Sequence, residues 1–481
     1  MVSSPAVDTI QSTRSEPVSY FSKPIVGTVV AIAVALAIKL QPQIGQLDST
    51  GQSALAIMAL AVGLWVADAM NAGITAVLAL GLLIIAGVPS NVALGGFAGG
   101  AFWILVSVLF FGTAMDKTGL ARRISYRILL IVPPTYAGVS VAFLLIGFAL
   151  TLGVPSMTVR TAIMVPIAVA LVHTIKLPMP SRGAALIVLG AFEMAVLPGC
   201  AVLTGSLWGP FVAGLFSTTG LPITWIDYAR VMTVPTVIWC GLVVAANVVV
   251  MRPPPASGMS RDVVRDEMQK LGPMSAAEMK TAAIITVSVL AWAVQPWHRV
   301  PPEAIGMVAL AALFATRTLV ASEIGTGIPW ALAIFVGGML SLTTVISTYK
   351  INVWLGSYIV PTVQPFVANP YLLVVVLSIA VAAMRFVDPV GFITIAAFFL
   401  PLAKFVAERG VPPLVLTAII VLPTHVFWFS YQNIWLAMTD GISRGNAYTN
   451  DDRFKLATVY FGATIAALWI GVAYWRLLGL V

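Results

Sequence analysis

The fold is decided by two short stretches of sequence, Val154-Pro155-Ser156-Met157-Thr158-Val159-Arg160-Thr161 and Arg385-Phe386-Val387-Asp388-Pro389-Val390-Gly391. Each is polar, contains a proline, and lies inside a long apolar segment that carries a second proline, Pro166 or Pro401. Irregular backbone survives in hydrocarbon only where it is packed in protein or lines a cavity. Paired interruptions at corresponding places in two halves are typical of the binding site of a membrane transporter.

Composition places the chain in a membrane. Of its 481 residues, 59% are hydrophobic and only 9% are charged, whereas soluble domains carry about 25% charged residues. The length allows roughly ten spans of about 20 residues. The net charge of +8 comes mainly from basic residues in loops between apolar runs, which favours a lipid bilayer as partner and no nucleic acid. Two cysteines and three widely spaced histidines predict no metal centre and no cofactor, although a sodium ion stays open.

The apolar runs predict an all-α polytopic protein. They lie at 24–40, 53–67, 72–88, 98–115, 138–176, 184–218, 230–250, 279–296, 303–316, 327–346, 370–408, 414–439 and 456–479. We expect 138–176 and 370–408 to form re-entrant hairpins, because Pro or Gly interrupts runs that are too long for one helix. We expect 184–218 and 414–439 to be broken spanning helices. About eleven crossings then remain, arranged as two inverted repeats.

The distribution of Lys and Arg predicts the orientation and the domains. Loops 41–52 and 89–97 contain no Lys or Arg, so the positive-inside rule makes them external. The resulting division is a cytoplasmic tail 1–23, a first half 24–251, a cytoplasmic linker 252–278 and a second half 279–481. Pro253 to Pro255 should end one helix, and Ser275 with Glu278 reads as a capping box that begins the next. The expected location is the bacterial cytoplasmic membrane.

Four stretches resemble a known family, the divalent anion–sodium symporters, which include sodium-coupled dicarboxylate, citrate and sulfate carriers. The stretches are Phe102 to Arg123, Leu271 to Glu278, Ile328 to Gly338 and the two hairpins with their prolines. The resemblance implies eleven spans, two hairpins, a homodimer and an elevator-like transport domain. It also implies Ser-Asn-Thr at each hairpin tip and a polar break in each following helix, which together bind sodium and substrate carboxylates.

The family motif transfers only in part. The first tip reads Ser156-Met157-Thr158 and the second reads Gly391-Phe392-Ile393. The breaks become Ser206-Leu207-Trp208-Gly209 and Ser430-Tyr431-Gln432-Asn433. Because Met157 and Phe392 stand where the family has Asn, neither side chain can offer sodium an oxygen. The resemblance therefore supports the fold more strongly than it supports sodium coupling.

Arg160 is the main candidate for substrate binding. An arginine in mid-membrane costs about 2.5–3.5 kcal/mol or more, so a compensating group is expected. A guanidinium beside a helix N-terminus would bind carboxylate or sulfate with two parallel hydrogen bonds. The alternative is a structural ion pair with Glu193 or Asp388.

The remaining candidates also have two interpretations each. Arg385 and Asp388 form either an internal ion pair or a second substrate arm with a proton or cation site. Glu193 is either a proton carrier or the partner of a buried arginine, and His425 either faces the site or packs. Aromatic residues such as Trp208 are predicted to face lipid or to pack, and one or two that line the site would favour apolar bulk in the substrate. The predicted substrate-binding residues are Ser156, Thr158, Arg160, Thr161, Ser206, Arg385, Asp388, Gly391, Ser430, Gln432 and Asn433.

The sequence thus predicts a secondary active transporter of small organic anions, mono- or dicarboxylates, with weakened or absent sodium coupling. A sodium- or proton-coupled sulfate or sulfonate symporter is the alternative within the same fold. A membrane-embedded enzyme would need clustered Asp, His or Cys motifs, which the sequence lacks, so no enzymatic activity is expected. A passive anion channel would not need broken helices in both halves.

Overall fold

The computed structural model describes residues 23–154, 156–221, 223–255, 261–388 and 391–481, and within these ranges it contains helices and no β-strand. Most of the predicted tail 1–23 lies outside the described residues, as do Pro155, Pro389 and Val390. The helices of the first half and the linker are α1 (Lys23–Leu40), α2 (Ser49–Ala67), α3 (Ala72–Ile85), α4 (Ser90–Ala93), α5 (Gly95–Ala98), α6 (Gly100–Thr118), α7 (Leu120–Ile131), α8 (Tyr136–Thr151), α9 (Met157–Thr174), α10 (Arg182–Val196), η1 (Leu197–Cys200), α11 (Trp208–Thr219), α12 (Trp225–Met251) and α13 (Asp262–Lys270).

The second half follows with a similar order of elements. Its helices are α14 (Ala276–Ala293), α15 (Gln295–His298), α16 (Pro302–Ala315), α17 (Glu323–Thr326), α18 (Trp330–Thr348), α19 (Ile351–Val367), α20 (Pro370–Met384), α21 (Phe392–Ala407), α22 (Pro413–Val421), η2 (Leu422–His425), η3 (Ser430–Gln432), α23 (Ile434–Ile442) and α24 (Asn450–Leu477).

The two halves repeat one sequence of elements. A long helix (α6 or α18) leads to a further helix (α7 or α19), then a hairpin (α8–α9 or α20–α21), a broken segment (α10–α11 or α22–α23) and a last long helix (α12 or α24). Eleven candidate crossings result in the described ranges when each broken segment counts once and the hairpins, α7 and α19 are left out: α1, α2, α3, α6, α10–α11, α12, α14, α16, α18, α22–α23 and α24. The predicted fold class is confirmed. Eight helices in the described ranges are long and apolar enough to span a membrane, and shorter apolar helices accompany them.

Two helices are missing from the apolar runs read from the sequence, α7 and α19. Helix α7 carries Arg122, Arg123 and Arg127, so its apolar residues form one face and no continuous run. Helix α19 contains Pro361 and Pro365, which are unusual inside a helix. Both precede a hairpin and therefore strengthen the correspondence between the halves.

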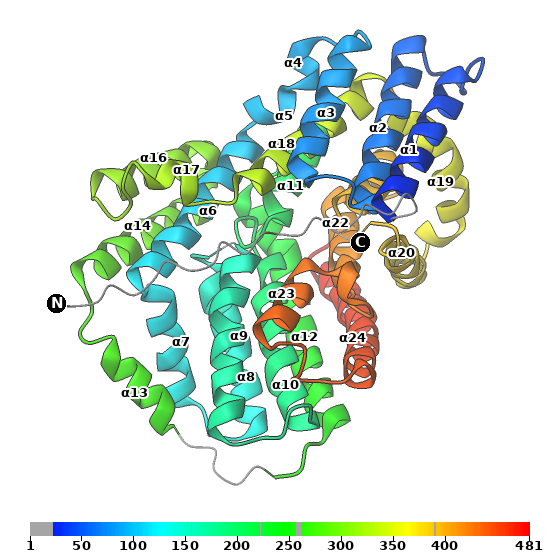
Figure 1. Ribbon diagram of the computed structural model, residues 1–481. Helices are drawn as coiled ribbons and strands as arrows, with labels where there is room; N and C mark the ends of the chain where they lie inside the picture. The colour runs from blue at the N-terminus through cyan, green and yellow to red at the C-terminus, as the bar shows by residue number, and fades with distance from the viewer. Residues whose placement is uncertain (1–22, 155, 222, 256–260, 389–390) are drawn as a thin grey trace, which may run out of the picture.

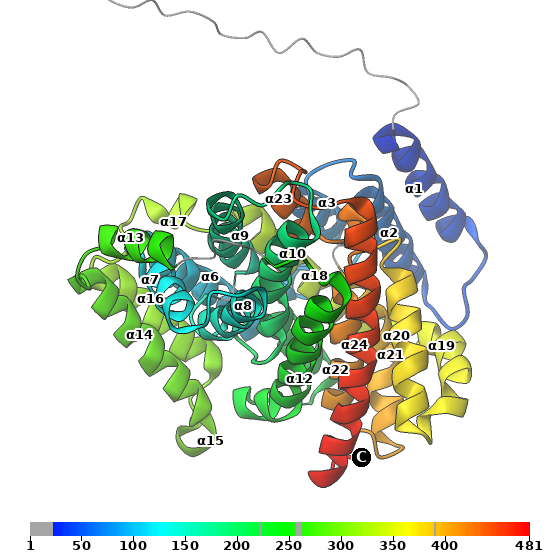
Figure 2. The same cartoon turned by 90° about the horizontal axis from the view of Figure 1, so that it is seen from below.

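Packing brings the two halves together along their last long helices. Figure 2 shows α12 (green) and α24 (red) side by side over much of their length, and they are in contact. Trp475 of α24 donates its indole N–H to the carbonyl of Val231 at 3.0 Å. In Figure 1, α8 and α9 lie beside α10, and α23 lies next to α9. The two breaks and the hairpin ends consequently lie within one helical assembly.

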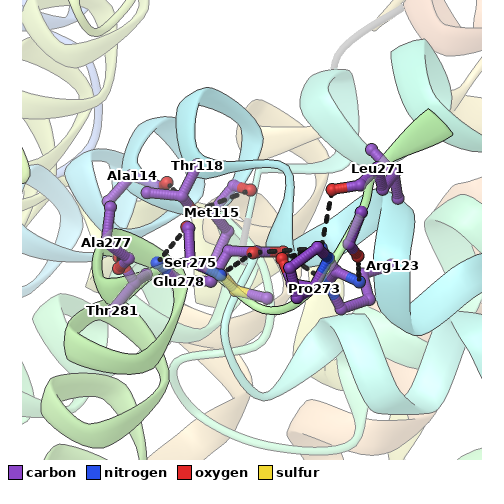
Figure 3. A network of polar contacts seen from close by, with 11 residues as sticks. Ala114, Met115, Thr118, Arg123, Leu271, Pro273, Ser275, Ala277, Glu278 and Thr281 are labelled. Atoms are coloured by element: carbon purple, nitrogen blue, oxygen red, sulfur yellow. Dashed lines mark hydrogen bonds and ion pairs between the residues drawn. The ribbon is translucent and has the colours of Figure 1, made fainter. Parts of the chain in front are cut away.

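The linker folds around an ion pair between α7 and α14 (Figure 3). Arg123 Nε lies 2.6 Å from Glu278 Oε1, and Arg123 Nη1 donates to the carbonyl of Gly272 at 2.9 Å. The side chains are only 4% and 3% exposed. The predicted capping box is also present, since Glu278 Oε2 accepts the N–H of Ser275 at 2.7 Å while Ser275 caps α14. Two of the stretches that resemble the family, Phe102 to Arg123 and Leu271 to Glu278, are thus in direct contact.

Candidate functional site

The first tip, defined as residues 152–158 without Pro155, joins α8 to α9. Ser156 is the N-cap of α9, and its Oγ accepts the N–H of Val159 at 3.3 Å. Thr158 Oγ1 accepts a hydrogen bond from the indole N–H of Trp435 in α23 at 3.2 Å. A predicted site residue of the first half therefore contacts the second half directly.

Arg160, in the first turn of α9, has no exposed surface. Its Nη1 donates to Thr151 Oγ1, whereas Nε and Nη2 have no hydrogen-bond partner among the described residues. No described carboxylate forms an ion pair with this guanidinium within 4.0 Å, which excludes the ion pair with Glu193 or Asp388 that the sequence left open. Thr161, the next residue, is also buried, and its hydroxyl lacks a partner in the described part of the chain.

The guanidinium of Arg160 lies against the break of the first broken segment, residues 197–207 between α10 and α11. A Cβ atom on Gly199 would lie 2.5 Å from Arg160 Nη2 and 2.9 Å from the Cβ of Ser206. Only glycine leaves room for the arginine at this position. Ser206 is buried and accepts the backbone N–H of Trp208 on its Oγ at 3.3 Å. The first site thus gathers Arg160, Gly199 and Ser206 from two elements.

The second tip, defined as residues 385–394 without Pro389 and Val390, joins α20 to α21 and is organised differently. Asp388 Oδ1 accepts the N–H of Gly391 at 2.8 Å, and Oδ2 accepts the N–H and the hydroxyl of Thr394 at 2.7 and 2.8 Å. The carboxylate is therefore a cap for α21. Arg385 donates to the main-chain carbonyls of Asp388 and Gln432. Its contact with Asp388 is through the backbone, not the carboxylate.

The second broken segment divides its polar residues between two places. Gln432 is buried, with its Oε1 accepting the N–H of Phe429 at 3.0 Å, and Asn433 caps α23 through the N–H groups of Trp435 and Leu436. Ser430 is partly exposed, donates to Asp440 at 3.0 Å and accepts from Arg453 at 2.9 Å. Ser430 is therefore engaged with α23 and α24.

Aromatic rings join the break of the first half to the second tip. Trp208 lies 4.5 Å from Phe392 and 5.6 Å from His425, measured between ring centroids. His425 is buried, also packs against Trp239 at 5.8 Å, and has its Nε2 3.6 Å from the sulfur of Cys200. Trp208 is therefore a packing residue, one of the two places that the sequence predicted for it, while its contact with Phe392 was not predicted.

Glu193 lies in α10 and is paired with an amide. Its Oε2 accepts a hydrogen bond from Asn247 Nδ2 in α12 at 2.5 Å, while Glu193 Oε1 and Asn247 Oδ1 have no partner among the residues described. Glu193 is therefore not the partner of a buried arginine. The proton-carrier interpretation of Glu193 stays a prediction.

Several buried hydrogen-bond donors around the tips and breaks have no acceptor among the described residues. Arg160 Nε and Nη2, Trp208 Nε1 and Gln432 Nε2 are buried and lack an acceptor in the described ranges. A buried charge without a partner is strongly unfavourable, and anionic oxygens form short, charge-assisted hydrogen bonds with such donors. This chemistry suits a bound anion.

Comparison with known proteins identifies the family of the chain. Residues 22–481 match the sodium:sulfate symporter transmembrane region. A Cupriavidus necator membrane protein is 26% identical over 69% of both chains, and the chloroplastic dicarboxylate transporter 1 of Arabidopsis thaliana is 22% identical over 79% of this chain and 69% of its own. A putative malate transporter of Bacillus subtilis, YflS, is 23% identical over 62% and 64% of the two chains.

Among solved structures, the Alcanivorax borkumensis YdaH transporter superposes with a TM-score of 0.57 at 11% identity, covering 95% of this chain and 99% of that one. At this identity the likeness concerns the fold alone. The match to the family covers nearly the whole chain, so this protein is a membrane transporter, not an enzyme, and it belongs to the sodium:sulfate symporter family.

Proposed function

We propose that the protein is a secondary active carrier of small organic anions, mono- or dicarboxylates, with Arg160 as the principal anion-binding group. The observation that carries this proposal is a fully buried guanidinium that has two unpartnered N–H groups and no acidic partner in the described chain. The names of the dicarboxylate and malate carriers among the relatives are consistent with it.

The surroundings of Arg160 suit a carboxylate. The first turn of α9 carries the partial positive charge of a helix N-terminus, and the guanidinium adds a permanent charge with a fork that matches two carboxylate oxygens. Ser206 adds a hydroxyl group nearby, and the next residue of α9, Thr161, has a buried hydroxyl without a partner among the described residues. A charge-assisted contact of this kind contributes about 1.5–3 kcal/mol.

The residues at the tips do not fit a sodium site made from side-chain oxygens. The side chains of Met157 and Phe392, each 1% exposed, offer no oxygen, while the hydroxyls of Ser156 and Thr158 each use one of their two lone pairs to accept a hydrogen bond. At the second tip, the Thr394 hydroxyl is donated to Asp388. We therefore propose that Arg160 supplies permanently the positive charge that sodium supplies elsewhere in the family.

A permanent charge has a consequence for coupling. An empty carrier would have to move an unpaired guanidinium through the membrane, which is costly, whereas a loaded carrier moves it neutralised. Elevator-type exchange of one anion for another satisfies this requirement in both half-cycles. Proton symport through Glu193 is the alternative, and it should give transport that rises when the outside is acidified.

Uptake into proteoliposomes tests the proposal. Labelled mono-, di- and tricarboxylates and sulfate are compared with and without a sodium gradient, a pH gradient and internal unlabelled anion. We expect saturable carboxylate uptake that needs internal anion and no sodium. A strict requirement for a sodium gradient, with saturable sodium dependence of binding, would overturn sodium-free exchange and imply cation sites built from backbone carbonyls.

A sulfate or sulfonate symporter is the second candidate, since the matching family is described by sodium and sulfate and a guanidinium fork also fits sulfate. In that case sulfate uptake would exceed the uptake of every carboxylate in the same screen. Current that grows linearly with anion concentration, without saturation or exchange, would indicate a channel.

Orientation and assembly are part of the proposal. We propose a cytoplasmic N-terminus, a cytoplasmic linker and a homodimer in the bacterial cytoplasmic membrane. Gln269 is exposed on α13, and both native cysteines are buried, so a Gln269→Cys variant offers one accessible thiol. Labelling of intact cells by a membrane-impermeant maleimide would contradict the orientation, and a monomeric mass in detergent by light scattering would contradict the dimer.

A further inference from the structure

A cavity of about 290 Å³ lies between the first broken segment and four neighbouring helices. Its wall comes from α5, from the N-terminal ends of α6 and α16, and from the C-terminal halves of α11 and α18. In the upper half of Figure 1, α11 lies beside α6 and α18 and is in contact with both. Leu203, which belongs to the break before α11, also lines the cavity. The cavity therefore extends to the broken segment.

This cavity lies at the end of α6 that is remote from the linker. Helix α6 begins at the cavity with Gly100 and ends at Thr118, shortly before Arg123, which is bound to Glu278 at the end of the linker. Ser217, in the last turn of α11, lines the cavity and is exposed, so the cavity is open to its surroundings. With the linker in the cytoplasm, as proposed above, the cavity faces the outside.

Glu303, in the first turn of α16, carries the charge of this cavity. No other residue that lines it in the described chain is charged. The carboxyl group lies over Gly100, where a Cβ atom would be 2.5 Å from Glu303 Cδ and 2.7 Å from Oε1. None of the ion pairs formed within 4.0 Å by the described residues includes Glu303. The carboxylate is therefore available to act on a passing ion.

The rest of the wall gives an anion little in return. Thr218 and Thr344 donate their hydroxyl hydrogens to carbonyls of their own helices, at 2.8 and 3.1 Å. The N-terminal ends of α6 and α16 attract anions through their partial positive charges, and the Glu303 carboxylate offsets this attraction. Its own effect on an anion is repulsive and is twice as large for a dianion as for a monoanion, because Coulomb energy is proportional to charge.

We propose that this cavity is the outer entrance to the first broken segment, and that Glu303 is a specificity-determining residue in it, which disfavours dicarboxylates relative to monocarboxylates. This inference rests on the proposed function and ranks the anions within its substrate class. Electrostatic effects of this kind on the arrival of charged ligands are well established for clefts lined by charge of one sign.

Thiol labelling of purified protein in detergent measures the charge of the cavity without any transport. Both native cysteines are buried, so Ser217→Cys offers one accessible thiol there. It is treated with methanethiosulfonates of similar size that carry one negative or one positive charge. Glu303→Gln should raise the ratio of anionic to cationic labelling rates about tenfold at low salt, and the charge-conserving Glu303→Asp should leave it nearly unchanged. Gln269→Cys on α13 is the control thiol, whose ratio should not respond to Glu303→Gln.

Uptake from the outside measures the role of the cavity as an entrance. A four-carbon monocarboxylate and a four-carbon dicarboxylate are compared as initial rates well below saturation. Glu303→Gln should raise the ratio of dicarboxylate to monocarboxylate uptake about threefold, since the two anions differ by one charge, and Glu303→Asp should not. Ser217→Lys, which adds a positive charge to the same wall, should shift the ratio in the same direction. Modification of Ser217→Cys with a bulky maleimide should block uptake that the treated wild type retains.

Three results would overturn the inference. The labelling ratio of Ser217→Cys could stay the same in Glu303→Gln, the ratio of dicarboxylate to monocarboxylate uptake could stay the same, or uptake could survive complete modification of Ser217→Cys. If Glu303→Gln fails to fold, an unchanged uptake ratio in Ser217→Lys decides against the inference.

These outcomes are distinguishable from a failure of the proposed function. Arg160→Ala should lower the uptake of both anions and leave the labelling ratio of Ser217→Cys unchanged. Uptake that depends on Arg160 but whose ratio ignores Glu303 removes only the role of Glu303. Absence of any Arg160-dependent uptake in wild type removes the proposed function, and the inference with it.

Discussion

The two hairpin tips have the same architecture but use their charges in different ways. At the first tip, the helix is capped by a neutral hydroxyl from Ser156, and Arg160 keeps two N–H groups without an acceptor in the described chain. At the second tip, the cap is the carboxylate of Asp388, and Arg385 is bound to main-chain carbonyls. The guanidinium of the first tip has N–H groups left for an anion, while the guanidinium of the second tip is bonded to main-chain carbonyls.

The comparison shows why an inverted repeat need not give a symmetric site. A helix N-terminus attracts an anion wherever it occurs, but an internal carboxylate at that position competes with a substrate. Asp388 fills this position in α21, and nothing acidic fills it in the described part of α9. We therefore propose that the asymmetry concentrates the binding of substrate at the first tip.

The largest expected effect is on stability, from Arg385→Ala. Removing a charged donor from two buried carbonyls costs about 1.5–3 kcal/mol for each bond, so the loss should reach about 3 kcal/mol or more. Thermal unfolding in detergent should show a clear decrease in Tm. An unchanged Tm with a large loss of anion affinity would make Arg385 a substrate arm and abolish the contrast between the tips.

Arg160→Ala, unlike Arg385→Ala, should reduce anion affinity and leave stability unchanged. Affinity for the transported anion should fall by about tenfold or more, since a charge-assisted contact contributes about 1.5–3 kcal/mol. The Tm of the anion-free protein should not fall, because the variant removes a buried charge that lacks an ionic partner. Arg160→Lys should rescue only part of the affinity, since lysine lacks the bidentate fork. Near-normal binding by a folded Arg160→Ala protein would show that Arg160 is structural.

The two caps give a smaller, graded prediction. Ser156→Ala should cost about 1 kcal/mol, as for a typical N-cap, and Asp388→Ala should cost about 2 kcal/mol because the carboxylate accepts three bonds. Both are measured as changes in unfolding free energy in detergent. Equal losses of unfolding free energy in Ser156→Ala and Asp388→Ala would argue against a stronger helix cap at the second tip.

Ser430→Ala should have the smallest effect. Ser430 is partly exposed and bonded to Asp440 and Arg453, so anion affinity should stay within about twofold and stability within about 0.5 kcal/mol, as for typical surface changes. Ser206→Ala, the corresponding change in the first break, is the comparison and should weaken binding more. A larger loss of anion affinity in Ser430→Ala than in Ser206→Ala would indicate that Ser430 binds the substrate.

Much of the fold can be predicted from the sequence, because membrane spans require long apolar runs and because Pro, Gly and polar residues mark where these runs are interrupted. The Ser275–Glu278 capping box, the stop before Pro253 and both breaks follow from local rules. Helix α7 could not be predicted in this way, because its three arginines interrupt what would otherwise be an apolar run. The partner of Arg123 is remote in sequence, so only the folded chain reveals its bond to Glu278.

The site was less predictable because spacing does not fix which partner a charge selects. Arg385 and Asp388 are three residues apart, as an ion pair would require, yet the arginine binds the backbone and the carboxylate caps α21. Gly199 lies against the Arg160 guanidinium and Trp208 packs on Phe392, and both contacts depend on the packed structure. Their only sequence signal is their position next to the Ser206 break.

Hydrogen exchange measured by mass spectrometry tests the asymmetry most directly. Purified protein in sodium-free detergent buffer is compared with and without a saturating concentration of the transported anion. The account predicts that the anion slows exchange in peptides covering 157–161 and 199–208, and that peptides covering 391–395 change little. Equal protection at both tips, or protection that appears only when sodium is added, would contradict the claim that the first tip alone holds the anion through Arg160.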